Sequence, residues 1–181
     1  MAASWVAVQH EGVTVTMIAN PPVAAVEFDP RDFRRTLGRF ATGVTVVTYE
    51  HEGEYLGATV NSFTSVSMDP PLVLVSLATT SRAAERMLGK PFAINVLQHD
   101  QHDIAMCFAG KPDAVDAVHW NVDHLAPRLA ESHAAFVCEP WAVHEAGDHL
   151  LVVGRVHHYE AAEEGDALAF YKGQFLPLGV A

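Results

Sequence analysis

The stretch from Ala134 to Tyr159, AAFVCEPWAVHEAGDHLLVVGRVHHY, decides the fold class of this chain. Its apolar and β-branched residues predict two strands, 134–144 and 149–159, and the residues between them, 145–148, predict a hairpin turn. Four successive apolar residues, 150–153, indicate that the second strand is covered on both faces. A barrel interior together with a helix or a second subunit would supply both covers.

The rest of the chain continues this pattern of short strands, with few helices between them. Apolar runs predict further strands at 44–49, 55–60, 72–78, 92–97 and 168–171. Capping residues and helical spacing predict helices at 30–41 and 82–88 and a third that begins at 100 or 101 and ends at 108. The sequence therefore predicts a mainly β fold in which an antiparallel sheet closes into a barrel, rather than a doubly wound α/β sheet.

Length and charge limit the organisation of the chain and its partners. With 181 residues it is long enough for one sizeable core and too short for two ordinary domains. We expect a loosely ordered N-terminal extension at 1–25, followed by one domain at 26–181; the alternative for the extension is an extra edge strand at Val13–Ile18. The formal charge of −11 makes nucleic acid and anionic membranes unsuitable partners.

Two features of the sequence predict a cytoplasmic location. The cysteines are Cys107 and Cys138, without a CxxC pair, which fits a reducing compartment. No apolar run is long enough to span a bilayer, and residues 1–25 lack the basic start of a secretory signal.

The segment from Gly57 to Pro71, GATVNSFTSVSMDPP, concentrates hydroxyl side chains and one Asn in what we expect to be half-buried strand and loop. An unpaired polar group there would cost about 1 to 3 kcal/mol. Two interpretations account for them. The hydroxyls bond to nearby backbone, or they hold the edge of a flat heterocycle rich in N–H and C=O groups, a description that a flavin ring fits.

A second polar segment follows at Ser76–Arg82, SLATTSR, where hydroxyls and one Arg meet a predicted helix start. Helix N-termini carry free N–H groups and partial positive charge, so they bind phosphate even in an acidic protein. The alternative is a capped turn with a solvated Arg82.

Taken together, these motifs resemble the flavin reductase family that supplies reduced flavin to two-component monooxygenases, including phenol, hydroxyphenylacetate and styrene hydroxylases. The resemblance covers Phe28 to Leu178. Besides the two polar segments, it rests on the following motifs in the same order: Phe33-Arg34, FATGVTVVT at 40–48, FAINVL at 92–97, GDH at 147–149, GRV at 154–156 and FYKG at 170–173.

This resemblance implies an antiparallel, FMN-binding split β-barrel of Greek-key type that forms a homodimer, with flavin near the subunit interface. The implied activity is hydride transfer from NADH or NADPH to FMN or FAD, with the reduced flavin passing to a separate monooxygenase. The resemblance also implies roles for single residues. The isoalloxazine ring is lined by Thr59, Val60, Asn61 and Ser62, the ribityl chain lies along Ser76 and Leu77, and the phosphate is bound by Ser81 and Arg82. Phe108 borders the flavin, and the nicotinamide lies near Tyr171 and near His149, which is the implied catalytic residue.

Two positions depart from the family pattern. Ala114-Val115 stands where a basic residue followed by Phe is common, and Lys172 stands where Arg is common. The loop before Trp120 is therefore expected to shape pyridine nucleotide binding differently.

Other functions are compatible with parts of the sequence. A flavin-binding electron carrier would keep the Gly57 to Ser67 site without a nicotinamide site, and an oxidase of the pyridoxamine phosphate type would need more basic residues than Arg82. His99 and His102 share a predicted helix face, but no second close pair completes a zinc ligand set, so we expect no metal site. The absence of GxGxxG excludes a Rossmann-type nucleotide site.

Overall fold

A computed structural model describes residues 5–10, 13–18, 27, 29–114 and 117–179. The chain divides into two compact units, residues 1–37 and 38–181. Residue 26, the expected start of the folded domain, lies outside the described residues, and so does Val115.

The first unit contains a β-hairpin and one helix. Strand β1 (Trp5–His10) pairs antiparallel with β2 (Val13–Ile18). The strand predicted as the alternative at Val13–Ile18 is therefore present, and it pairs with β1 rather than with the edge of the main sheet.

Helix α1 (Pro30–Leu37) completes the first unit. It begins after Asp29, whose side-chain oxygen accepts a hydrogen bond from the Arg31 N–H at 2.8 Å. The predicted continuation to Ala41 is wrong, because the helix ends before Gly38. Glycine is a poor helix former, and the Gly38 carbonyl instead accepts a hydrogen bond from the Lys172 N–H.

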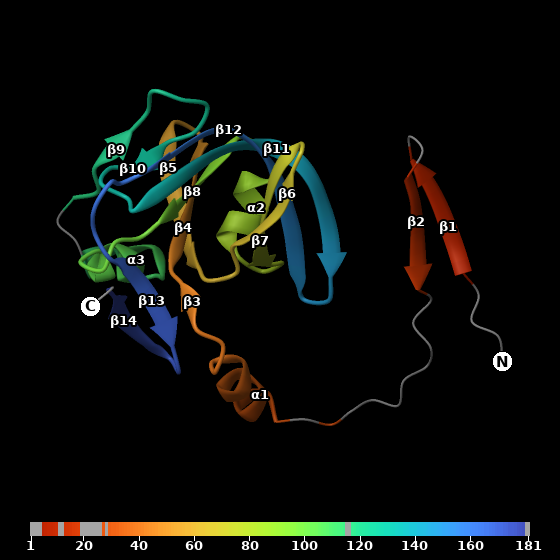
Figure 1. Cartoon of the computed structure of the whole chain (residues 1–181), viewed down its shortest axis with the longest axis horizontal. Helices are drawn as coiled ribbons and strands as arrows, with labels where there is room; N and C mark the ends of the chain where they lie inside the picture. Colours follow the sequence, from red (N-terminus) through yellow and green to blue (C-terminus); the bar gives the residue numbers. More distant parts are fainter. Residues whose placement is uncertain (1–4, 11–12, 19–26, 28, 115–116, 180–181) are drawn as a thin grey trace. The chain divides into compact units, whose positions relative to one another are not determined.

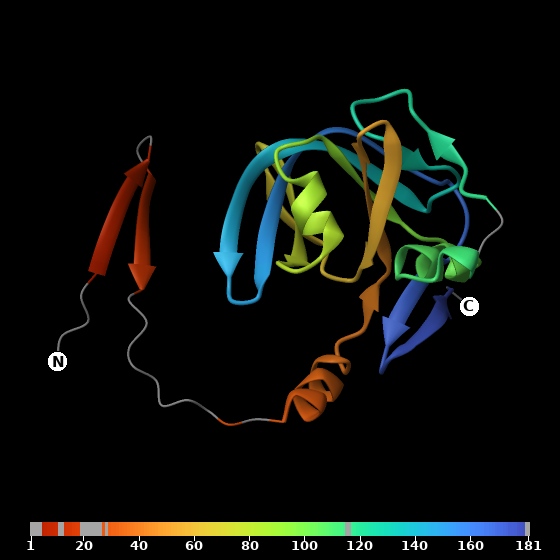
Figure 2. The same ribbon diagram turned by 180° about the vertical axis from the view of Figure 1, so that it is seen from behind.

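A seven-stranded antiparallel sheet with strand order β5-β4-β8-β11-β12-β7-β6 forms the body of the second unit (Figure 1). Its strands are β4 (Thr45–His51), β5 (Glu54–Val60), β6 (Thr64–Met68), β7 (Pro71–Ala78), β8 (Phe92–Val96), β11 (Ala134–Ala146) and β12 (His149–Ala161). The sheet curls around helix α2 (Arg82–Met87), as the view from behind also shows (Figure 2). The predicted mainly β, antiparallel fold with few helices is confirmed.

The β11–β12 hairpin is the longest pairing in this sheet and matches the prediction closely. Its turn contains Gly147 at a φ of +68°, a left-handed conformation that glycine adopts without steric cost. Pro140 lies at a register shift of β11, where the missing N–H does no harm to the ladder.

Smaller elements complete the unit. Strands β3 (Thr42–Gly43), β13 (Ala167–Tyr171) and β14 (Gln174–Leu178) form a three-stranded sheet, β9 (Trp120–Asn121) pairs with β10 (Arg128–Leu129), and helix α3 (His102–Phe108) precedes a short 3-10 turn, η1 (Pro112–Ala114). The sequence did not predict β6 or β14. None of the described helices is long and apolar enough to cross a membrane.

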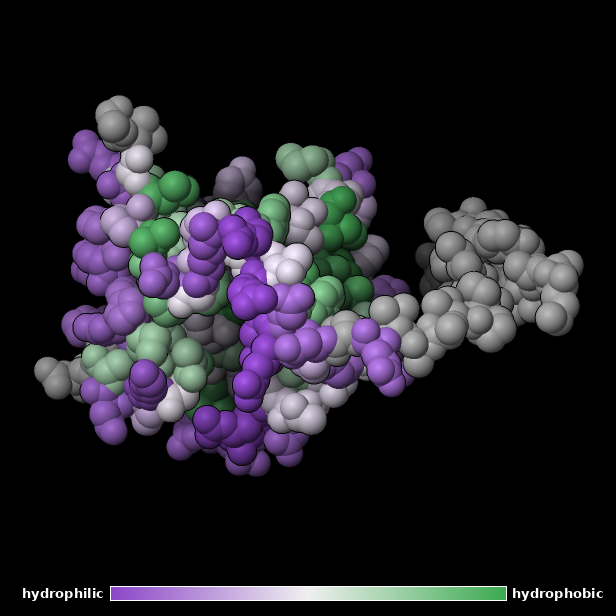
Figure 3. Space-filling view, turned by 90° about the horizontal axis from the view of Figure 1, so that it is seen from below, coloured by the Kyte–Doolittle hydropathy of each residue, from purple (hydrophilic) through white to green (hydrophobic). Residues whose placement is uncertain are grey.

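Besides a small third cluster of Ala93, Ala126 and Val137, two apolar clusters hold the second unit together. One lies between the sheet and α2 and contains Tyr49, Phe92 and Met87; the other lies under α3 and contains Leu97 and Leu168. On the face seen in Figure 3, hydrophilic residues form a band between hydrophobic patches. The sheet and α2 thus provide a rigid frame for the strand ends that carry the predicted site.

Candidate functional site

A pocket of about 330 Å³ lies where the end of β5, the end of β7 and the start of β12 meet. We call it the first pocket. Its lining includes most of the residues that the sequence singled out, namely Thr59, Val60, Asn61, Ser62, Ser76, Leu77, Ser81 and His149, together with Ala58 and Ala78. The volume lies in the range of small-molecule sites.

The antiparallel ladder explains why residues so distant in sequence meet here. His149 begins β12 and lies opposite Ala78 at the end of β7, and Leu150 lies opposite Leu77. The loop after β5 is fastened to β7 by Ser62, whose hydroxyl accepts from the Ser76 N–H at 3.0 Å and donates to the Ser76 carbonyl at 2.9 Å.

Three hydroxyls of the polar segment form hydrogen bonds within the protein, those of Thr59, Ser62 and Thr64, the last with the Ser65 carbonyl at 3.3 Å. Besides Ser62, Thr59 donates its hydroxyl to the Ala105 carbonyl of α3 at 2.6 Å. These bonds fix the shape of the pocket wall. The Asn61 side chain is exposed and forms no hydrogen bond with the described part of the chain, so its amide is free to contact a ligand.

Ser81 and Arg82 mark the start of α2, as predicted. The Ser81 hydroxyl accepts a hydrogen bond from the Ala84 N–H at 3.1 Å and caps the helix. Ser81 lines the first pocket, whereas Arg82 lines its neighbour. The two residues predicted to bind phosphate thus lie where two hollows meet.

This neighbouring hollow, the second pocket, has a volume of about 500 Å³ and shares Ala58 and Ser81 with the first. Arg82 and Phe108 belong to its lining. Phe108 packs against Gly57 so closely that a Cβ there would lie 2.9 Å from the ring.

A smaller pocket of about 160 Å³ adjoins the other end of the first one. It shares Thr59, Val60 and Asn61 and adds two aromatic side chains, Phe170 and Phe175. Sequence reasoning did not assign Phe175 to the site, because it belongs to the unpredicted strand β14. Tyr171 lines none of these pockets in the described structure; its ring lies 4.9 Å from the Lys172 ammonium.

His149 is held by its neighbour in the chain. Its Nδ1 lies 2.7 Å from a carboxylate oxygen of Asp148. The hydrogen bond from His149, followed by the charge of its ring, lowers the pKa of Asp148. The carboxylate therefore orients the imidazole through Nδ1, and Nε2 forms no hydrogen bond with the described residues.

Several histidines outside this pocket lie beside carboxylates. His157, for example, pairs with Glu139 at 2.9 Å. Within the described ranges, no three metal-ligating side chains converge on one point.

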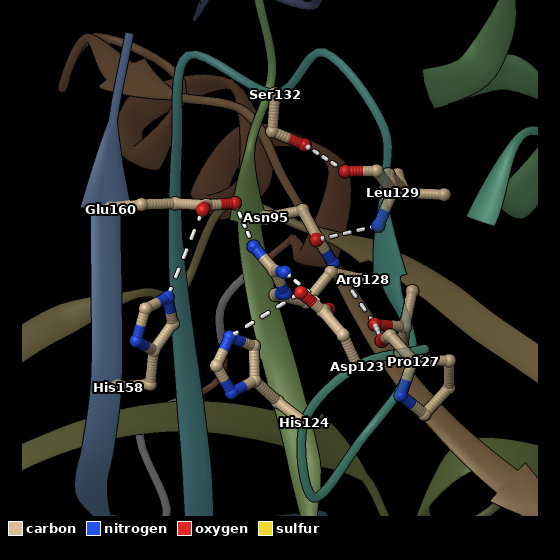
Figure 4. Close-up of polar contacts among 10 residues, drawn as sticks. Asn95, Asp123, His124, Pro127, Arg128, Leu129, Ser132, His158 and Glu160 are labelled. Carbon is tan, nitrogen blue, oxygen red and sulfur yellow. Dashed lines mark hydrogen bonds and ion pairs between the residues drawn. The ribbon is translucent and has the colours of Figure 1, made fainter. Parts of the chain in front are cut away.

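A polar cluster around the buried Arg128 side chain fixes the loop between β9 and β10 (Figure 4). The guanidinium of Arg128, 3% exposed, donates to Asp123 at 2.6 Å and to Glu160. The rings of His124 and His158 stack beside it, with centroids 3.8 Å apart. Burial, and then the positive charges of His124 and Arg128, lower the pKa of His158, while Asp123 acts in the opposite direction.

Asn95 ties this loop to the main sheet. Its amide donates to the Val46 carbonyl and to the Thr48 hydroxyl, and its carbonyl accepts from the Leu129 N–H at 2.9 Å. The anchored loop carries Trp120, whose ring lies 5.9 Å from that of Phe108. Arg128 and Asn95 thereby support the wall of the second pocket from behind, a role that no local sequence signal indicates.

Comparison with known proteins places the chain in a family. The model of the flavin reductase like domain matches residues 37–179. An FMN reductase (NADH), SmoA of Agrobacterium fabrum, is 44% identical over 80% of this chain and 84% of its own. The reductase subunit HsaB of a flavin-dependent monooxygenase from Rhodococcus jostii is 39% identical over 84% of this chain and 80% of its own.

The solved structures agree with this result. The flavin reductase PheA2 in its native state superposes with a TM-score of 0.80, at 36% identity, over 84% of this chain and 100% of PheA2. The split β-barrel implied by the resemblance is thus confirmed, as is the predicted family. The chain belongs to the flavin reductase like domain family.

Proposed function

We propose that this protein is an NADH-dependent flavin reductase, which transfers a hydride to FMN or FAD and releases the reduced flavin to a separate monooxygenase. The observation that carries the proposal is the convergence of three strand ends on the first pocket, with the Asn61 amide unpaired and phosphate-binding groups at one end. Among the relatives, SmoA is named as an NADH-dependent FMN reductase, and HsaB is named as the reductase subunit of a flavin-dependent monooxygenase.

The residues of the pocket divide the work of binding. Thr59 to Ser62 border the ring, and the Asn61 amide hydrogen-bonds to its polar edge. Ser76 and Leu77 run along the ribityl chain towards Ser81, where the helix start and Arg82 bind the phosphate. Phe108 borders the far side.

Hydride transfer requires two stacked rings and little acid or base, since the flavin and the nicotinamide supply the redox chemistry. The task of the protein is to position them. His149, oriented by Asp148, contacts the nicotinamide amide through Nε2. Tyr171 lies outside the pockets of one chain, so its contact with the nicotinamide requires the dimeric site.

The proposed homodimer is supported by the outer face of β12. Leu150 and Val152 pack under α2, so the alternation of a strand directs Leu151 and Val153 to the opposite face. Beside that face, Trp141 is 51% exposed. Val153 is already buried within one chain, whereas a second copy of the chain would cover Leu151 and Trp141, and sedimentation analysis tests for it. The two free cysteines favour a cytoplasmic location.

An anaerobic mixing experiment tests the activity. Purified protein, FMN or FAD, and NADH or NADPH are combined, and the visible absorbance of the oxidised flavin is followed. Bleaching with NADH supports the proposal. Flavin binding without bleaching by either nucleotide would refute the reductase and favour the electron-carrier alternative.

A further inference from the structure

The second pocket is larger than the proposed ring site and opens from it. It measures about 500 Å³ against about 330 Å³, and the two meet at Ala58 and Ser81. The phosphate of a flavin mononucleotide bound in the first pocket would reach only this junction. The greater part of the second pocket is then left for another group.

The charge of the second pocket points to an anionic group. Arg82 and Arg86 both line it, one helical turn apart and hence on one side of α2. Neither forms an ion pair within the described residues, unlike Arg128 and Arg155. Glu85 lies between them in sequence but does not line the pocket.

Two unpaired guanidinium groups at one hollow are unexpected in a chain with a formal charge of −11. Their field reaches the inner wall. Burial raises the pKa of Tyr49, the positive charges of Arg86 and Arg82 act against that rise, and the charge of Glu85, the smallest of these effects, adds to it. Both guanidinium groups therefore lie near the Tyr49 hydroxyl at the floor of the pocket.

Aromatic side chains form another part of the lining. The rings of Tyr55 and Phe108 both belong to the pocket, and Trp120 backs them at centroid distances of 5.5 and 5.9 Å. Tyr55 is 40% exposed, so its ring is open to a stacking partner. Flat aromatic surfaces beside positive charge suit a nucleobase with its phosphate.

On the basis of the proposed function, we propose that the second pocket binds the adenosine monophosphate half of FAD, with Arg82 and Arg86 on its two adjacent phosphates. FAD rather than FMN is then the preferred flavin. The nicotinamide nucleotide also contains an adenosine monophosphate half. FAD is favoured because the pockets join at Ser81, where the first flavin phosphate lies, so the second phosphate follows directly into the second pocket.

Binding measurements on the full chain test this assignment. Calorimetric titration with FMN and with FAD is carried out on the wild type, on Arg86→Gln, and on Lys90→Gln. The last variant removes the same charge just after α2 without touching either pocket. We expect the wild type to bind FAD at least about tenfold more tightly than FMN, or about 1.4 kcal/mol. Arg86→Gln should lose about tenfold for FAD only, and Lys90→Gln should leave both affinities nearly unchanged.

Other results would overturn the inference in distinguishable ways. Equal affinity of the wild type for FMN and FAD, or an equal loss of both in Arg86→Gln, would show that the second pocket does not select FAD. A higher KM for NADH with unchanged FAD affinity in Arg86→Gln would assign the pocket to the nicotinamide nucleotide. Binding of neither flavin would refute the proposed function itself.

A thiol reporter gives an independent readout. Cys107 lines the second pocket, whereas Cys138 is fully buried, and burial raises its pKa to about 12. Burial, and then the charge of Asp113, also raise the pKa of Cys107, but Cys107 is only half-buried, so a thiol reagent at alkaline pH should label it selectively. FAD should slow the labelling of Cys107 while FMN should not. Equal protection by both flavins would contradict the assignment.

Discussion

Gly154 in the middle of β12 offers a sharp test of the packing that supports the site. A Cβ at this position would lie 2.5 Å from Cζ of Phe92 and 2.8 Å from Cβ of Cys138. Both neighbours are fully buried, at 1% and 0% exposure, so neither can move aside into solvent. Overpacking of a close-packed core costs about 1 to 3 kcal/mol, and we expect Gly154→Ala to lie in the upper half of that range.

Urea and thermal unfolding measure this cost. A chain of this size should lose about 4 to 12 °C in Tm for a loss of about 2 to 3 kcal/mol. Gly43→Ala is the matched control, because a Cβ there meets nothing within 4 Å, and it should stay within about 0.5 kcal/mol of the wild type.

The cause of the loss can be isolated with a second substitution. Phe92→Leu removes the ring atom nearest to the new methyl group, so the double variant should recover about 1 kcal/mol relative to the sum of the single changes. Strict additivity, or a Gly154→Ala variant as stable as the wild type, would refute the packing argument.

The remaining predictions concern the pockets and the buried cluster. A Cβ at Gly57 would lie 2.9 Å from the Phe108 ring, so Gly57→Ala should push that ring into the second pocket. The variant should therefore bind FAD more weakly, as measured by fluorescence quenching. Asn61→Ala should weaken flavin binding, whereas His149→Ala should mainly raise the KM for NADH; equal loss of flavin affinity in both would contradict the division of roles. Burial lowers the pKa of His158, so just below pH 6.5, its ordinary pKa, the unfolded chain binds a proton that the folded chain does not bind. The free energy of unfolding should therefore fall as the pH drops below 6.5, less steeply in His158→Gln, and identical slopes would exclude this role.

Patterns that reflect burial were predictable from the sequence. The β11–β12 hairpin and β7 follow from apolar runs, because one or both faces of each strand are covered. Helix α2 follows from the Ser81 cap and from Gly89, whose φ of +74° ends it. The same reasoning overextended α1, since Phe40 continues its apolar spacing beyond the glycine at which the helix ends.

Elements without a buried stripe were missed. Strand β6 reads TSVSM and lies at an edge of the main sheet, where it is largely exposed. Strand β14 contains Pro177, which reads as a break, although an edge strand tolerates it. The turn between β13 and β14 lies at Lys172-Gly173, where φ is +50° and +79°. Gly173 was the one residue in this segment that indicated a hairpin turn.

The sequence predicted where the candidate site lies, but it did not predict all of the residues that line or support it. Thr59 to Ser62 and Ser76 to Ser81 carry local polar signals, and the structure brings them together. Arg86 follows Arg82 by four residues, a spacing that places both side chains on one side of a helix. Its role in the site could not be predicted, because it depends on a hollow that only the tertiary structure forms. Buried Asn95 and Arg128 lie in segments that read as ordinary strand and loop.

The charge distribution connects these residues to the proposed release of reduced flavin. Net charge acts over a Debye length of about 8 Å at physiological salt, so the acidic surface repels a flavin phosphate as it approaches or departs. Under the proposed function, Ser81 at the junction of the two pockets and Arg82 and Arg86 in the second pocket would provide the opposing attraction through short contacts that salt screens far less. A few side chains of one six-residue helix therefore set the balance between holding a flavin and releasing it.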